Sequence, residues 1–322
     1  MKNFALIGAS GYIAPRHMKA IKETNNTLIA ALDKFDSVGI IDSYFPNADF
    51  FTEFERFDRH ISKLKFEKNT QLDYVSICTP NYLHYEQTIY ALQMGKHVLV
   101  EKPAAMDTTQ MIEMMSVARA QDRLLAVGHM WRYHPEVISF RDSIRAGELG
   151  NIIRTHGYGV HAHWGPSGWF IDKSLAGGGA LIDMGIHAID TARFLLDDPQ
   201  PVRVQATIGF GKYGDYEVDD DGIITVDWDN GVCSVIESGW WQPKLRGLEA
   251  ETEVMGTTGY RKIWPNMPPV PKGYNHCETE MYARQLQDVV ACISSGATPA
   301  CSAEVGFTAL DIVEKAYKAA AA

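Results

Sequence analysis

An apolar run, Phe4–Ile7, leads directly into a turn that holds Gly8 and Gly11, and a helical pattern follows. Backbone N–H groups of such a turn lie at the positive end of a helix dipole, where they suit a pyrophosphate group. Gly8 allows a tight turn, Gly11 leaves room for phosphates, and Ala14 permits close helix packing. The usual G-x-G-x-x-G spacing is altered by one position, so an ordinary strand-to-helix turn is the competing interpretation.

Asp33 supplies a second signal. It ends the apolar stretch Thr27–Leu32. An acid about 20 residues after the glycine turn accepts the ribose hydroxyls in dinucleotide-binding chains. A carboxylate here repels the extra phosphate of NADP, so the pattern favours NAD. The competing interpretation is a solvated loop acid, but strand, turn, helix and acid in this order favour dinucleotide binding.

Short apolar strands alternate with helical patterns through the first third of the chain. The expected strands are residues 4–7, 27–32, 74–78, 97–100 and 124–127. This order is typical of a doubly wound parallel sheet, the α/β arrangement of a Rossmann domain, which we expect over residues 1–127. Ligands of such sheets bind at the carboxyl ends of the strands, and the polar residues Asp33, Thr79 and Glu101 all follow strand ends.

The pattern changes from about residue 128. Longer alternating segments are expected as strands at residues 152–163, 202–210, 222–228, 231–238 and 250–256. One helix, from about Gly178 to Leu196, interrupts the strands, and two more helices close the chain. These features predict a second, α+β domain over residues 128–322 with a mostly antiparallel sheet. Its last helix is a candidate for packing back on the first domain.

The composition of the chain limits the classes of partner that it can be expected to bind. The formal net charge of −10 argues against a nucleic-acid groove and against binding to an anionic membrane surface. No apolar stretch approaches the roughly 20 residues needed to span a bilayer, and the N-terminal apolar run is too short for a signal peptide. Five cysteines are scattered without a C-x-x-C pair, which is typical of reduced thiols. We therefore expect a cytoplasmic protein with a small-molecule partner.

Three titratable side chains share one face of the helix expected near residues 178–196. Asp183, His187 and Asp190 stand at positions i, i+4 and i+7, beside an apolar stripe and behind three glycines. This placement indicates the wall of a pocket. A satisfied, partly buried structural histidine is an equally strong interpretation of His187.

Four motifs together resemble one family. The glycine turn, "CTPNYLH" (78–84), "EKP" (101–103) and "GGGALIDMGIHAID" (177–190) are similar to motifs of the glucose–fructose oxidoreductase/inositol dehydrogenase/rhizopine-catabolism (Gfo/Idh/MocA) family. The resemblance covers nearly the whole chain. It implies a Rossmann domain followed by a domain with a large open sheet, whose faces pair subunits into a homodimer or homotetramer. It also implies that Lys102, Asp183 and His187 are catalytic.

These residue types suit the oxidation of a secondary alcohol, in which carbon gives a hydride to NAD and the hydroxyl loses its proton. A histidine accepts a proton near neutral pH, and an ammonium group stabilises a developing alkoxide. Asp183 would hold substrate hydroxyls or orient the imidazole. Either Lys102 or His187 could transfer the proton, and we favour His187.

We therefore expect an NAD-dependent dehydrogenase that acts on a sugar, inositol, glycoside or sugar nucleotide. One alternative is a glycosidase that uses bound NAD for transient oxidation of its substrate. Another is a non-catalytic NAD-binding sensor, although a sensor has no need for all three catalytic residues.

The two halves of the chain resemble different relatives. Residues 4–21 and 36–57 are similar to UDP-N-acetylglucosaminuronate 3-dehydrogenases, whereas residues 177–190 are similar to inositol and free-sugar or glycoside dehydrogenases. The sugar-nucleotide enzymes carry an asparagine at the position of Asp183. Because the second domain should govern specificity, this departure argues against a nucleotide sugar.

Two tryptophan-containing segments, residues 161–170 and 237–243, are candidate pocket loops. Tryptophan faces stack on sugar rings, although each tryptophan here is as well explained by the core or by a subunit contact. Arg132 could bind a carboxylate or phosphate, or form a structural ion pair. His161 and His163 have same-face strand spacing, but no further ligand motif accompanies them, so we expect no metal.

The expected ligand-binding residues follow from these motifs. The expected cofactor site comprises Gly8, Ser10, Gly11, Tyr12, Ile13, Asp33, Thr79, Pro80, Asn81, His84, Glu101 and Lys102. The expected substrate site comprises Lys102, Trp131, Arg132, His161, His163, Trp164, Asp183 and His187.

Overall fold

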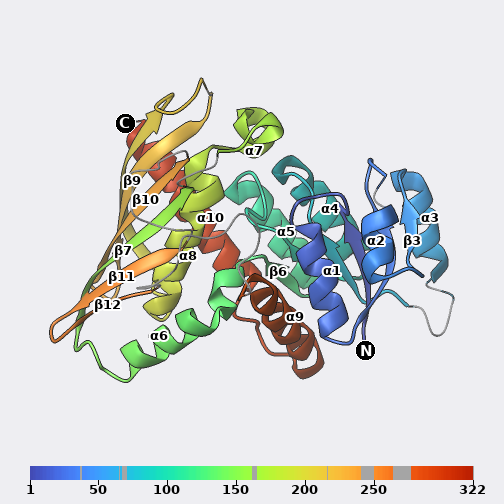
Figure 1. Cartoon of the computed structure of the whole chain (residues 1–322), viewed down its shortest axis with the longest axis horizontal. Helices are drawn as coiled ribbons and strands as arrows, with labels where there is room; N and C mark the ends of the chain where they lie inside the picture. The colour runs from blue at the N-terminus through green and yellow to red at the C-terminus, as the bar shows by residue number, and fades with distance from the viewer. Residues whose placement is uncertain are drawn as a thin grey trace. The chain divides into compact units, whose positions relative to one another are not determined.

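The computed structural model describes residues 1–36, 38–64, 66, 71–161, 165–215, 217–240, 250–263 and 277–321. The chain divides into two compact units (Figure 1). The first unit comprises Met1–Ala105, Thr109–Met130 and Tyr274–Ala303, and the second comprises Met106–Thr108, Trp131–Gly273 and Glu304–Ala322. Each unit therefore draws on separate stretches of the chain. The domain boundary at residues 127 and 128 stays a prediction.

The first unit is built on a parallel six-stranded sheet, sheet A. Its strands are β1 (Asn3–Ile7), β2 (Thr27–Leu32), β3 (Asp49–Phe51), β4 (Tyr74–Ile77), β5 (His97–Val100) and β6 (Leu125–Val127). They lie in the order β3-β2-β1-β4-β5-β6, and every pairing is parallel. The order reverses between β1 and β4, which is the switch point where doubly wound sheets bind ligands. The predicted Rossmann fold is confirmed.

Helices cover sheet A. They are α1 (Ala14–Glu23), α2 (Val38–Tyr44), α3 (Phe54–Leu64), α4 (Asn81–Gln93), α5 (Thr108–Ala120) and α9 (Cys277–Ser295). Strands β1, β4 and β5 are buried along nearly their whole length, because a parallel sheet needs cover on both faces. Helix α9 comes from far along the chain and packs against α1. Residues 34–73, for which the sequence predicted no strand or helix, contain α2, β3 and α3.

The second unit contains another six-stranded sheet, sheet B. Its strands are β7 (Ile152–His161), β8 (Pro201–Phe210), β9 (Asp219–Trp228), β10 (Cys233–Trp240), β11 (Glu251–Gly256) and β12 (Tyr260–Lys262). They lie in the order β12-β11-β7-β10-β9-β8. Strands β7 and β10 are parallel, and all other neighbours are antiparallel. The predicted mostly antiparallel sheet is confirmed.

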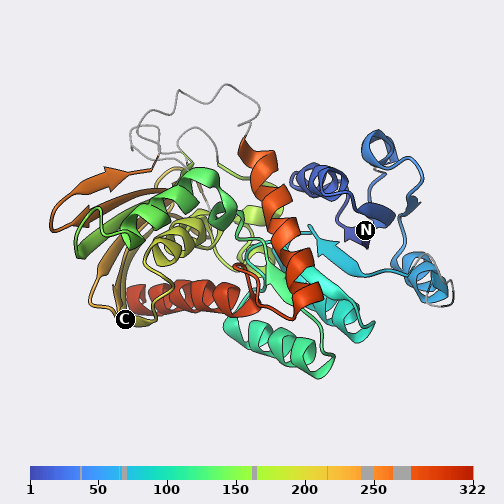
Figure 2. The same ribbon diagram turned by 90° about the horizontal axis from the view of Figure 1, so that it is seen from below.

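One face of sheet B carries helix α8 (Ile186–Leu195), which contacts β7, β10 and β11 (Figures 1 and 2). Two glycines of β7 make this contact close. A Cβ atom on Gly159 would lie 2.2 Å from the carbonyl oxygen of Met184, and one on Gly157 would lie 3.3 Å from the Ala188 side chain. The remaining helices of the unit are α6 (Pro135–Arg145), α7 (Lys173–Ala176) and α10 (Ala303–Ala320). The sequence predicted one regular helix from about Gly178 to Leu196, but the structure has a π-helical turn, Leu181–Gly185, directly before α8.

Candidate active site

The glycine turn lies over the switch point of sheet A. The N–H groups of Gly8 and Ala9 donate to the carbonyl oxygen of Leu32, at 2.8 and 3.3 Å. Gly8 has a φ of +92°, and a Cβ atom there would lie 2.7 Å from backbone atoms of Cys78 and Thr79. Only glycine combines this conformation with this approach. The turn is therefore pressed against the carboxyl end of β4.

Asp33 is tied to the same turn. One of its carboxylate oxygens accepts the N–H of Ser10 at 2.8 Å, and the other accepts the N–H of Phe35 at 2.9 Å. Each oxygen keeps a further lone pair, so the carboxylate can still accept two ribose hydroxyls. The N–H of Gly11 donates to the carbonyl oxygen of Gly8 and that of Ala14 to Gly11, both at 3.1 Å, and Pro15 has no N–H, so these positions offer no free backbone donor.

His84 has a position that the sequence did not reveal. Its ring is buried, and its two nitrogens lie 2.7 Å from the carbonyl oxygens of Thr79 and Pro103. The ring thus joins the loop after β4 to the loop after β5. Both ring nitrogens contact backbone carbonyl oxygens, and the predicted contact of His84 with a cofactor stays a prediction.

Glu101 forms hydrogen bonds within the protein through both its backbone N–H and its carboxylate. Its N–H donates to Ile77 at 3.0 Å, which ends the ladder of β4 and β5. Its buried carboxylate lies 2.7 Å from the Nε2 atom of His17, a residue of α1 that the sequence analysis overlooked. The available signal was a histidine on the apolar face of an amphipathic helix. Lys102, half-buried, follows directly.

The catalytic aspartate expected from the family motif lies on a π-helical turn, Leu181–Gly185. The N–H of Ile186 reaches back five residues to Leu181, so the predicted α-helical spacing between Asp183 and His187 is wrong across this turn. A side chain at Gly185 would collide with Leu181, and strand β7 lies against Met184. The π turn is therefore packed closely against sheet B. Turns of π-helix are rare in proteins overall, but those that occur are frequently found at functional sites.

A buried carboxylate from sheet B holds the start of the π turn. Asp219 accepts the N–H groups of Gly179 and Leu181, both at 2.8 Å, and the hydroxyl of Tyr317 at 2.6 Å. Burial raises the pKa of Asp219 above its ordinary value even though these donors favour the carboxylate. A Cβ atom on Gly179 would overlap the Asp219 backbone, which explains a glycine there.

Trp240 orients Asp183. The indole N–H donates to the Oδ2 atom of Asp183 at 3.1 Å, and the ring is fully buried with Ala180, Met184 and Val218. Of the two interpretations of this tryptophan, the structure supports the core. His187 lies in the first turn of α8, next to the π turn, and is 2% exposed.

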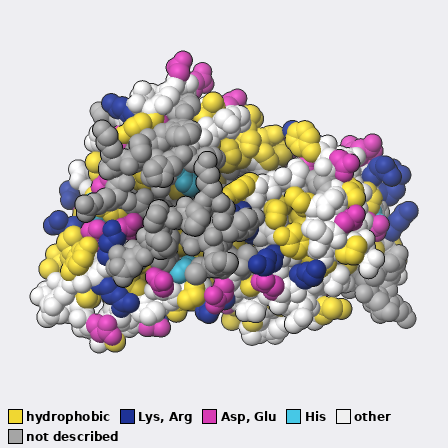
Figure 3. Space-filling view, in the orientation of Figure 1, with side chains coloured by type: hydrophobic (Ala, Val, Ile, Leu, Met, Phe, Trp, Pro, Cys, Tyr) yellow, Lys and Arg dark blue, Asp and Glu magenta, His cyan; other side chains and the backbone are white. Residues whose placement is uncertain are grey.

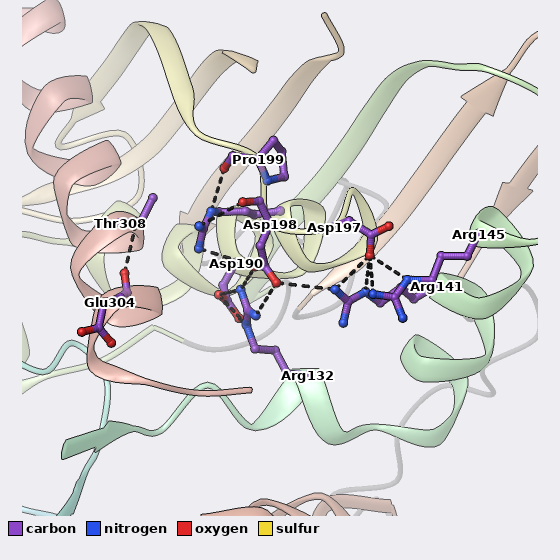
Figure 4. A network of polar contacts seen from close by, with 10 residues as sticks. Arg132, Arg141, Arg145, Asp190, Asp197, Asp198, Pro199, Glu304 and Thr308 are labelled. Atoms are coloured by element: carbon purple, nitrogen blue, oxygen red, sulfur yellow. Dashed lines mark hydrogen bonds and ion pairs between the residues drawn. The ribbon is translucent and has the colours of Figure 1, made fainter. Parts of the chain in front are cut away.

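Arg132 forms the structural ion pair rather than a free anion site. Its Nε atom donates to both oxygens of Asp190 at 2.9 Å, and its other nitrogens bind Asp198 at 2.6 and 3.2 Å (Figure 4). Burial by itself lowers the pKa of Arg132, but the two carboxylates more than offset this and raise it. Arg141 and Arg145, both on α6, form ion pairs with Asp197 in the same network. Asp190 is thereby committed to structure and not to a pocket.

We expect Asp190→Ala to lower the free energy of unfolding by about 3–5 kcal/mol, because the change leaves the Arg132 guanidinium buried with one carboxylate fewer. Urea unfolding followed by tryptophan fluorescence measures this loss. Asp227→Ala is the matched control: its partner Arg203 is 2.6 Å away, against 2.8 Å between Asp190 and Arg132, but the Arg203–Asp227 pair is exposed and should contribute less than about 1 kcal/mol. Equal losses in the two variants would contradict a stabilising network.

The other predicted substrate residues are dispersed over the second unit. Trp131 is buried against the ring of His134, with 5.7 Å between ring centroids. His161 ends β7, next to Trp240 of β10 in the parallel register. His163 and Trp164 lie outside the described residues. Among the side chains that the structure describes, no three of His, Cys, Asp or Glu come together as a metal-binding group.

Family models match both units. A model described as an oxidoreductase family with an NAD-binding Rossmann fold matches residues 2–129, and a model of the GFO/IDH/MocA C-terminal domain matches residues 137–261. D-glucoside 3-dehydrogenase of Escherichia coli is 37% identical over 183 residues, which are 52% of each chain, so the match spans about half of that relative. 1,5-Anhydro-D-fructose reductase of Ensifer adhaerens is 31% identical over 80% of this chain and 74% of that protein.

Solved structures show the same fold. Myo-inositol 2-dehydrogenase from Lactobacillus plantarum superimposes with a TM-score of 0.81 at 23% identity, covering 99% of this chain and 97% of that one. The WlbA dehydrogenase from Thermus thermophilus, in complex with NAD and UDP-GlcNAcA, gives a TM-score of 0.74 at 23% identity, covering 97% and 94%. Since the sequence matches extend over both units, the chain belongs to the Gfo/Idh/MocA family of NAD-binding oxidoreductases.

Proposed function

We propose that this protein transfers a hydride between NAD and a secondary alcohol or ketone of a small carbohydrate or polyol. The observation that carries the proposal is the set of hydrogen bonds that fix the backbone around Lys102 and the side chain of Asp183, two of the three catalytic residues that the family motifs predict. Lys102 stands on a turn whose flanking residues are bonded to α1 and α4. Asp183 stands on a π turn that a buried carboxylate and Trp240 hold. Such fixed supports suit groups that must meet a reacting carbon within a fraction of an ångström.

The residues fit the cofactor. The glycine turn binds the pyrophosphate, with the N–H groups of Tyr12 and Ile13 as the nearest candidates, since the N–H of Ala14 donates to Gly11 and Pro15 has none. The Asp33 carboxylate receives two ribose hydroxyls through the lone pairs that Ser10 and Phe35 leave open. This carboxylate repels a 2′-phosphate, so we propose a preference for NAD over NADP. When bound, NAD⁺ accepts the hydride that the substrate carbon loses.

The protein side chains handle the proton and the charge. His187 accepts the hydroxyl proton, so that carbon and oxygen are left joined by a double bond once the hydride has gone. The Lys102 ammonium stabilises the negative charge that develops on this oxygen. Asp183, oriented by Trp240, accepts a hydrogen bond from a neighbouring substrate hydroxyl or from the imidazole. In the reverse direction the same groups reduce a ketone.

We also propose that copies of the chain pair through sheet B. The face away from α8 carries Tyr158, Ile223 and Tyr260, the last two more than half exposed, beside the paired His156 and Glu237. A broad face of apolar and paired polar side chains is typical of a subunit contact. In contrast, acidic and basic side chains are interspersed on the face that Figure 3 shows.

No helix that the structure describes combines the length and apolar character needed to cross a bilayer. We propose a cytoplasmic enzyme without a membrane or nucleic-acid partner.

A substrate panel tests the proposal. We expect reduced nicotinamide to appear, by its absorbance, when purified protein and NAD⁺ meet glucosides, anhydrosugars or inositols, and at least tenfold more slowly with NADP⁺. UDP-sugars should be poorer substrates than free sugars or glycosides. A glycosidase would instead release reducing sugar without net NADH. If the protein binds NADH but oxidises and hydrolyses nothing in the panel, the dehydrogenase proposal fails and a sensor is favoured.

A further inference from the structure

The carboxylate of Glu101 is held on three sides. Its Oε1 atom lies 2.7 Å from Nε2 of His17, and its Oε2 atom accepts the N–H of Lys102 at 3.3 Å. Gly128, whose N–H bonds to Val100, closes the third side. A Cβ atom at Gly128 would lie 2.7–2.9 Å from the two oxygens and the carboxyl carbon. The carboxylate therefore lies flat against the backbone of Gly128 and has no room to turn.

The residue after Lys102 is held by a second histidine. The carbonyl oxygen of Pro103 lies 2.7 Å from Nδ1 of His84, whose Nε2 atom lies 2.7 Å from the carbonyl oxygen of Thr79. His84 is 1% exposed, so water does not compete for these contacts. Burial lowers the pKa of His84 more than its contacts with the two carbonyl oxygens raise it.

His17 and Glu101 form a charged pair. Burial by itself lowers the pKa of His17, but its contacts with Cys78 and Glu101 overcome this effect and raise the pKa above its ordinary value. Burial also raises the pKa of the Cys78 thiol, which leaves Glu101 as the anion that pairs with the imidazolium. The edge of the Tyr282 ring and the thiol are the other groups against His17. Since a buried ion pair adds little net stability over an apolar pair, specific placement is the better explanation of its presence.

We propose that His17 and His84 are positioning residues that fix the Glu101–Pro103 turn from both sides and so orient Lys102. The inference rests on the proposed function of Lys102. It assigns the two histidines no contact with substrate. His17 connects the turn to α1, the helix that follows the glycine turn, so Lys102 and the phosphate-binding backbone are aligned by one buried contact. His84 connects the same turn to the loop after β4.

The first experiment reads the position of Lys102 without turnover. Lysines are reductively methylated with isotopically labelled formaldehyde, and the Lys102 signal is assigned by its loss in Lys102→Met. We expect this signal to shift in His17→Phe and in Gly128→Ala, which displaces the Glu101 carboxylate while keeping both histidines. Gly39→Ala is the matched control, since a Cβ atom at Gly39 meets nothing within 4 Å. It should leave the signal unchanged.

The second experiment reads the reaction. Gly128→Ala should lower kcat by about a hundredfold, the effect of a misplacement of roughly 1 Å, while NAD⁺ affinity stays within about threefold. The isotope effect on oxidation of a deuterated substrate should rise. A purely structural role would change the unfolding midpoint but neither readout. If folded Gly128→Ala and His17→Phe keep the wild-type Lys102 signal, the inference is overturned; a shifted signal in a protein that oxidises no substrate would refute only the proposed function.

Discussion

Lys102→Met is expected to lower kcat by about a hundred- to thousandfold, because the variant lacks the only ammonium group proposed to meet the developing alkoxide. Methionine keeps the length and apolar stem of the side chain. The turn should keep its shape, since Glu101 and Pro103 are bonded through other atoms to His17 and His84. NAD⁺ binding, measured by titration of the protein fluorescence, should change by less than about tenfold.

Lys19→Met is the control for this prediction. Lys19 lies on α1 in an exposed i, i+4 pair with Glu23, so its removal takes away one positive charge without touching the turn. Its kcat should match that of the wild type. A Lys102→Met protein that turns over at the wild-type rate would show that the alkoxide is stabilised elsewhere.

Much of the architecture was predictable because it depends on local patterns. Short apolar strands separated by helices specify a parallel sheet, and strand ends place Gly8, Asp33 and Glu101 along the same edge of that sheet. The alternation after residue 128 likewise predicted a mostly antiparallel sheet, although not the parallel pairing of β7 and β10. In the missed region, residues 34–73, the three-residue β3 and the seven-residue α2 offer little periodicity, whereas α3 buries Phe57, Ile61 and Leu64 at helical spacing and could have been detected.

The supports of the site were not predictable, because they depend on contacts between distant residues. Asp219 holds a turn 38 residues away, and Trp240 reaches Asp183 across 57 residues. The π turn packs closely on Gly159 through Met184, a contact that no helical periodicity encodes. Asp190 has the spacing of a site residue, but a salt bridge with Arg132 buries it.

His187→Gln is the second large effect that we expect, with kcat falling by about a hundred- to ten-thousandfold through loss of the general base. Glutamine can still accept a hydrogen bond from the substrate hydroxyl, so substrate affinity should fall far less than kcat. His156→Gln is the control, because His156 lies on the opposite face of sheet B, paired with Glu237 at 2.7 Å. Its kcat should be unchanged.

The pH dependence of kcat separates His187 from Lys102 as the base. In the oxidising direction the base must be deprotonated, so the wild-type rate rises with pH until that group has lost its proton, and then levels. If His187 is the base, the rising limb disappears in His187→Gln and persists, at a lower rate, in Lys102→Met. The opposite outcome, with the rising limb kept in His187→Gln and lost in Lys102→Met, would identify Lys102 as the base that accepts the proton. In that case the buried imidazole would serve only to orient Asp183 or the substrate.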